Sequence, residues 1–127
     1  MMTEYPNWFK TTAQANFETY LLGDKDKDNL HYLQLGVFTG DATVWLCENV
    51  LTGNNSKVTD VDTWEGSDEQ AHKEMDFDDV YTVYKQKIKP YWSKVHTVRD
   101  TTKSFLIKEN YEPTGIRYDF IYIDADP

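Results

Sequence analysis

The chain has 127 residues, of which 15% are aromatic and 28% are charged, and its formal net charge is −9 at pH 7. This length allows one domain with a hydrophobic core, and without a long apolar run a membrane span is excluded. Nucleic acid is also excluded as a partner, because phosphate backbones bind basic surfaces and no cluster of Lys or Arg offsets the acids. The single Cys47 is expected to be a buried apolar residue in a protein of the reducing cytoplasm.

Residues 1–29 are predicted to form a helix followed by a loop. The helix is expected over Trp8–Leu22, with Gly23 positioned to end it. One face of this helix carries Phe9, Ala13, Phe17, Tyr20 and Leu21. We expect it to be an outer helix or a lid. The following residues 24–29 alternate in charge, which is typical of a solvated loop.

Strands alternate with helices in residues 30–127, which we treat as the core of a single domain. The expected strands are 30–37, 57–62, 94–98 and 118–124. The expected helices are 42–51, a segment that begins after an N-cap at Asp76 and ends before Pro90, and 102–108. This alternation predicts a parallel sheet joined by right-handed crossovers.

The first strand leads into a turn whose residues have the pattern of a cofactor cradle. The apolar run that starts at Tyr32 stops at Gly36, bends through Gly40 and enters a helix. Gly36 can take a positive φ and lets a ligand approach the backbone, and Gly40 permits close packing. Asp41 is expected to cap the helix, whose free N–H groups follow.

Two further strand ends carry acids. Val58–Asp62 ends in a carboxylate about 20 residues after the turn, where folds of this type hold a ribose. The third segment, Tyr118–Asp126, is a buried-strand pattern that also ends in acids. The order of these three motifs along the chain is far more specific than any one of them.

Together the motifs resemble those of class I S-adenosylmethionine-dependent methyltransferases, and in particular their small-molecule O-methyltransferase-like branch. Leu33–Thr43, Val61–Gly66 and Asp119–Asp126 are similar to the first, second and fourth motifs of that branch. The resemblance covers roughly residues 30–126. It implies an α/β fold with a Rossmann-like parallel sheet, flanking helices and the strand order 3-2-1-4, without the C-terminal strands of the full methyltransferase fold.

The resemblance also implies that the cofactor is S-adenosylmethionine, lying across the carboxyl ends of the strands. The cofactor-binding residues it implies are Gln34, Gly36, Phe38, Gly40, Asp62, Trp64, Asp100, Asp124 and Asp126. Gln34 stands where the family usually has an acid, so one negative charge near the cationic ligand is missing. Asp60 departs from the apolar or small residue expected within its strand, where a carboxylate is costly unless it is paired.

Three of these residues also have structural interpretations. Asp62 either accepts the ribose hydroxyls or serves as a helix cap or solvated turn acid. Trp64 either lies over the adenine or packs against the following helix. Asp100 contacts the adenine edge in the family, but either it or Thr101 could instead cap the next helix.

Asp124 and Asp126 correspond to the acids that end the fourth strand. In metal-dependent O-methyltransferases the first acid of this motif binds a divalent cation, which lowers the pKa of a substrate hydroxyl. The other metal ligands of that family come from a later strand that this chain does not contain, and Pro127 replaces its usual lysine. We therefore assign no metal and treat Asp124 as a site residue and the candidate catalytic group.

The sequence predicts a methyltransferase that acts on a small hydroxylated substrate. A nicotinamide-dependent oxidoreductase is the enzyme alternative, but it requires a tighter G-x-G-x-x-G turn than Gly36–Asp41 provides. The non-enzyme alternative is a truncated or split chain that binds a cofactor or partner without turnover. Because the fourth strand would be an exposed edge, we expect self-association or a C-terminal partner chain at that strand, and no turnover by this chain alone.

Overall fold

The computed structural model describes residues 4–66 and 75–124. A parallel sheet with the strand order β3-β2-β1-β4 forms its centre, as the sequence predicts. The strands are β1 (His31–Leu35), β2 (Lys57–Asp62), β3 (Val95–Arg99) and β4 (Phe120–Ile123). This is the Rossmann-like α/β arrangement, in which parallel strands are joined through helical crossovers.

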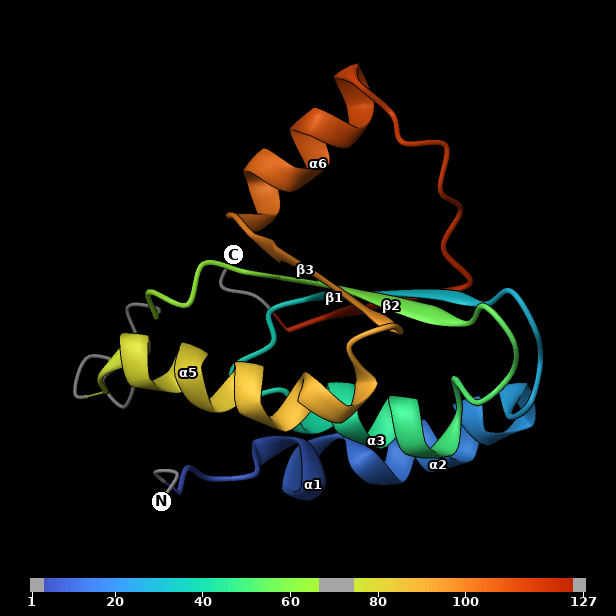
Figure 1. Cartoon of the computed structure of the whole chain (residues 1–127), viewed down its shortest axis with the longest axis horizontal. Helices are drawn as coiled ribbons and strands as arrows, with labels where there is room; N and C mark the ends of the chain where they lie inside the picture. The colour runs from blue at the N-terminus through green and yellow to red at the C-terminus, as the bar shows by residue number, and fades with distance from the viewer. Residues whose placement is uncertain (1–3, 67–74, 125–127) are drawn as a thin grey trace.

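Helices cover both faces of the sheet (Figure 1). On one face lie α1 (Trp8–Thr12), α2 (Gln14–Leu21), α3 (Asp41–Asn49) and α5 (Phe77–Ile88), and on the other lies α6 (Thr102–Tyr111). Short 3-10 helices, η1 (Leu22–Asp24) and η2 (Lys89–Tyr91), follow α2 and α5. Within the described residues no helix is long and apolar enough to cross a membrane.

The first predicted helix is two helices that meet at Ala13. Phe9, Phe17 and Leu21 are buried in the main core, as the periodicity predicts. Tyr20 is 79% exposed, so its predicted inward position is wrong. Tyr20 lies in α2 one residue before the buried Leu21, and successive side chains of a helix are turned about 100° from each other, so Tyr20 points to solvent while Leu21 faces the core.

The helix starts follow the predicted chemistry in part. The Asp76 carboxylate caps α5 by accepting hydrogen bonds from the backbone amides of Asp78 and Asp79. At α3 the N-cap is Gly40, and Asp41 is the first helical residue, so the predicted cap at Asp41 is wrong. Asp41 instead forms an ion pair of 2.8 Å with Lys87 of α5, which ties the two helices together.

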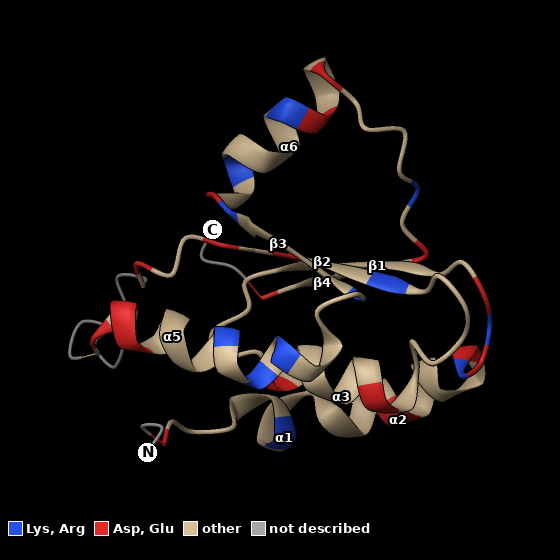
Figure 2. Cartoon of the chain, viewed as in Figure 1, with Lys and Arg blue, Asp and Glu red and all other residues tan. Residues whose placement is uncertain are grey.

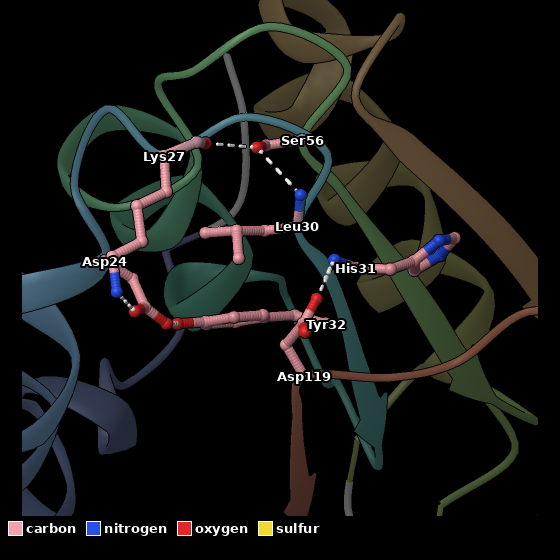
Figure 3. Close-up of polar contacts among 7 residues, drawn as sticks. All are labelled: Asp24, Lys27, Leu30, His31, Tyr32, Ser56 and Asp119. Atoms are coloured by element: carbon pink, nitrogen blue, oxygen red, sulfur yellow. Dashed lines mark hydrogen bonds and ion pairs between the residues drawn. The ribbon is translucent and has the colours of Figure 1, made fainter.

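The charged loop before β1 is attached to its neighbours by specific bonds (Figure 3). The Ser56 hydroxyl donates to the Lys27 carbonyl at 2.8 Å and accepts from the Leu30 amide at 3.2 Å. Tyr32 donates from its hydroxyl to Asp24 at 2.6 Å. At the start of β1, the His31 amide donates to the Asp119 carboxylate at 2.9 Å, which joins β1 to the residue before β4.

The other bounds differ from the predictions by a few residues. β1 and β4 are shorter than expected, and α6 extends to Tyr111. Cys47 is buried in the main core as predicted, and burial raises the pKa of its thiol to about 12. In the described part of the chain β4 pairs with β1 alone and therefore forms an edge of the sheet, where Ile121 and Ile123 are exposed.

Candidate functional site

The turn between β1 and α3 is built from residues with positive φ. Gly36 has φ +95°, Phe38 +59° and Gly40 +85°. The Gly36 amide donates to the Val61 carbonyl at 2.8 Å, so the turn starts against the end of β2. A Cβ atom on Gly40 would lie 2.7 Å from the Tyr84 ring, which confirms that a side chain is excluded where α5 packs on the turn.

Asp62 holds this turn through its carboxylate. One oxygen, Oδ2, accepts hydrogen bonds from the backbone amides of Val37 at 2.8 Å and Phe38 at 3.0 Å. The other oxygen, Oδ1, accepts from the Trp64 amide at 3.0 Å. Because each carboxylate oxygen has two lone pairs, Oδ1 can accept one more hydrogen bond. Asp62 thus organises the backbone at the carboxyl ends of β1 and β2 and retains acceptor capacity for a ligand.

Aromatic side chains surround the turn. The Trp64 indole Nε1 donates to the Phe38 carbonyl at 2.7 Å. Trp64 is only 1% exposed and packs on Tyr81 and Tyr84 of α5, with ring centroids 4.8 Å and 4.6 Å away. Its ring has no free face for an adenine in this structure, so its position is that of the packing alternative. Trp8 of α1 stacks on Phe38 with a centroid separation of 4.6 Å, which places the N-terminal segment over the turn.

A hollow opens at the carboxyl end of β1, between the turn, α1 and the end of β4. Gln34, Gly36 and Phe38 line it together with Asp124, so the structure brings these four predicted site residues together. Trp8, Asp41 and Tyr122 also line it. The predicted residues Asp62, Trp64 and Asp100 do not line this hollow; they lie along the neighbouring ends of β2 and β3.

The loop after β3 is connected to the end of β2. The Asp100 amide donates to the Asp62 carbonyl at 3.0 Å. The Asp100 carboxylate accepts from Lys108 of α6 at 3.0 Å, and this hydrogen bond is the main reason that its pKa is lowered. Thr101 caps α6, because its hydroxyl accepts from the Ser104 amide at 3.0 Å. Of the two capping alternatives, Thr101 is therefore the N-cap.

Acids gather where the strands end (Figure 2). Asp62 ends β2, Asp100 follows β3 and Asp124 follows β4. All three therefore lie at the carboxyl-terminal end of the parallel sheet. Among the described residues no group of three His, Cys, Asp or Glu side chains could hold a metal ion. Asp126 and Pro127 lie outside the described residues. The carboxyl-terminal end of the sheet is suited to a cationic ligand, because its carboxylates attract positive charge.

Asp60 lies within β2, two residues before Asp62, in a buried polar network. Its side chain is 0% exposed, and its carboxylate accepts hydrogen bonds from Gln34 Nε2 at 2.8 Å, the Thr43 hydroxyl at 2.7 Å and the Tyr84 hydroxyl at 2.8 Å. Burial raises the Asp60 pKa to about 6, although all three hydrogen bonds oppose the shift. These partners provide the compensation that a carboxylate inside a strand requires.

The comparison with known families agrees with this geometry. A family model described as a methyltransferase domain matches residues 33–127. The chain belongs to this family. The match begins within β1, so the methyltransferase domain includes the glycine turn and all four strand ends, whereas α1 and α2 precede it. None of the curated proteins compared with the chain matches it significantly.

Sequence reasoning missed several residues of the site. Thr43 and Tyr84 complete the Asp60 network, and Trp8 and Tyr122 line the hollow. The signal for the first pair was Asp60 itself, since a buried carboxylate requires hydrogen-bond donors from adjacent elements. Nothing in the local sequence of Trp8 could indicate its contact with Phe38, because the two residues are brought together by the packing of α1 on the core.

Proposed function

We propose that this methyltransferase domain binds S-adenosylmethionine and transfers a methyl group to a hydroxyl group of a small molecule. The observation that carries the proposal is the turn at Gly36, whose backbone is held by Asp62 beside a hollow lined by Gln34 and Asp124. The cofactor, when bound, supplies an electrophilic sulfonium methyl group. No enzyme nucleophile is needed, since positioning and proton removal are sufficient for transfer to a hydroxyl.

The residues present fit this cofactor. Gly36 and Gly40 leave the backbone free of Cβ atoms at the turn, and Asp62 Oδ1 keeps a lone pair for a ribose hydroxyl. Asp100 stands beyond Asp62 at the end of β3, where an adenine edge would follow the ribose. Asp124 faces the hollow from β4 and is our candidate for accepting the proton of the substrate hydroxyl.

Titration calorimetry with S-adenosylmethionine, S-adenosylhomocysteine and NAD tests the cofactor. We expect binding of the two adenosyl compounds and not of NAD. Binding of NAD alone would overturn the proposal in favour of the oxidoreductase alternative. Circular dichroism on the same samples establishes that the chain is folded, so that a lack of heat from a folded chain also counts against the proposal.

Methyl transfer to a panel of catechols and simple phenols tests the substrate class. Asp124→Asn is the matched variant, because it keeps the side-chain shape and removes the proton acceptor. The comparison is made in a preparation, the chain alone or its assembled form, in which the wild type turns over, and there the variant should lose turnover if Asp124 accepts the proton. Equal and measurable turnover by the two proteins would exclude this role for Asp124.

A further inference from the structure

The hydrogen bonds around Asp60 have a consistent direction. The Tyr84 hydroxyl bonds both Asp60 and the Thr97 hydroxyl, each at 2.8 Å. Since Tyr84 gives its single proton to the carboxylate, Thr97 must donate to Tyr84. The Thr43 hydroxyl likewise gives its proton to Asp60. The Thr43 and Tyr84 hydroxyls therefore donate directly to Asp60, and Thr97 donates to Tyr84, which is an arrangement that suits an ionised carboxylate.

This network determines how the Gln34 amide is oriented. Gln34 Nε2 donates one proton to Asp60 Oδ1 and the other to the Thr43 hydroxyl oxygen, both at 2.8 Å. Both amide protons are then used, and the two acceptors cannot bond the amide oxygen instead. The Gln34 carbonyl oxygen, Oε1, must therefore point away from Asp60, although the residue is only 1% exposed.

Gln34 lines the hollow at the carboxyl end of β1, and its two hydrogen bonds with described residues both involve Nε2 and not Oε1. Because no buried side-chain nitrogen or oxygen of the described residues lacks a partner, Oε1 must be open to the hollow. An amide oxygen held in this way offers a ligand one acceptor and no donor. The Asp60 carboxylate lies directly behind the same amide, and within the described part of the chain no Lys or Arg neutralises it through an ion pair. The negative charge of the Asp60 carboxylate therefore lies close to the acceptor Oε1, and it favours a cationic hydrogen-bond donor over a neutral one.

We propose that Asp60 is a positioning residue that directs Gln34 Oε1 toward the α-ammonium group of an amino-acid ligand and supplies the negative charge that β1 lacks. This inference rests on the proposed function and specifies how the methionine tail of the cofactor is recognised. The negative charge lies on Asp60 of β2, and the Gln34 side chain of β1 stands between it and the hollow. The alternative is that Asp60 only joins β1, β2, α3 and α5 and has no effect on ligand selectivity.

Two ligands distinguish these roles. S-adenosylhomocysteine carries the ammonium tail, whereas 5′-methylthioadenosine has the same nucleoside without the tail. Asp60→Asn removes the charge at nearly constant shape. We expect it to weaken S-adenosylhomocysteine binding about tenfold, the size expected for one screened charge, and to change methylthioadenosine binding less than about twofold. A merely structural change would weaken both ligands alike.

The double variant Gln34→Glu with Asp60→Asn moves the carboxylate from β2 to β1. It should restore S-adenosylhomocysteine binding to within about threefold of wild type, because the charge again faces the ammonium group. The matched control is Thr97→Val, which breaks the network at its far end and leaves the Asp60 charge in place. It is expected to lower stability without changing the ratio of the two dissociation constants.

Circular dichroism on each variant establishes folding. If Asp60→Asn does not fold, Gln34→Met replaces it, since this variant removes the acceptor oxygen, keeps Asp60, and should cause the same selective loss. Equal weakening of both ligands by a folded variant overturns the inference and leaves the proposed function intact. Failure of the folded wild type to bind either adenosyl ligand overturns the proposed function, and the inference with it.

Discussion

The contribution of Asp62 to stability can be derived from its hydrogen bonds. The carboxylate accepts from three backbone amides, at 2.8, 3.0 and 3.0 Å, and so joins the turn after β1 to the turn after β2. A hydrogen bond to a charged group contributes about 1.5–3 kcal/mol when it is shielded from water. Asp62 is half-buried, and water can replace part of each bond, so we expect Asp62→Ala to cost about 2–4 kcal/mol of unfolding free energy.

Urea denaturation followed by tryptophan fluorescence measures this cost. Asp119→Ala is the matched control, because its exposed carboxylate accepts from one backbone amide, that of His31, and should cost about 1 kcal/mol or less. Asp62→Asn should fall between wild type and Asp62→Ala, since the amide oxygen can still accept from Val37 and Phe38. If Asp62→Ala were no more destabilising than Asp119→Ala, our account of the turn would be wrong.

Four further outcomes are expected. Asp60 has a folded pKa of about 6, above its ordinary value of 3.8, so the folded state gains stability as the pH falls through 6 and gains no more once the pH is well below 3.8. The stability of wild type relative to Asp60→Asn should therefore rise by roughly 2–3 kcal/mol between pH 7 and pH 4, and a flat difference in pH-dependent urea curves would contradict this. Gly40→Ala should lower the melting temperature, because φ is +85° and the added Cβ would meet Tyr84. The control Gly23→Ala, whose added Cβ has no atom within 4 Å, should leave the melting temperature unchanged or raise it, and equal shifts in the two variants would refute the packing argument. Cys47 should react with a thiol reagent at pH 8 only after unfolding, and rapid labelling of the native chain would contradict its burial. Among the described residues β4 pairs only with β1, so its other edge should let a second copy pair with it. Sedimentation should then show association that Ile121→Lys reduces and Leu106→Lys on α6 does not, and a monomer at all concentrations would refute this prediction.

The sequence alone was sufficient for the order of the strands and for the family. The glycines of the first turn, the acid at the end of β2 and the alternation of strands with helices are local signals, since each depends on residue type and spacing. The alternation predicted a parallel sheet, and the resemblance of the motifs to those of class I methyltransferases implied the order β3-β2-β1-β4, which the structure confirms. The same signals placed Gly36 and Asp62 at adjoining strand ends, because parallel strands end at one edge of a sheet.

Only the tertiary structure decided what the acidic side chains contact. Asp62 was predicted from a ribose-binding pattern, but its bonds to the amides of Val37 and Phe38 depend on how closely β1 and β2 approach. Asp60 is an unexplained carboxylate in the sequence, and its partners Gln34 and Tyr84 come from β1 and α5. These contacts join residues that are distant in sequence, and their energies depend on how deeply the side chains are buried. Local sequence patterns reveal neither the contacts nor the burial, because both arise only when the elements pack together.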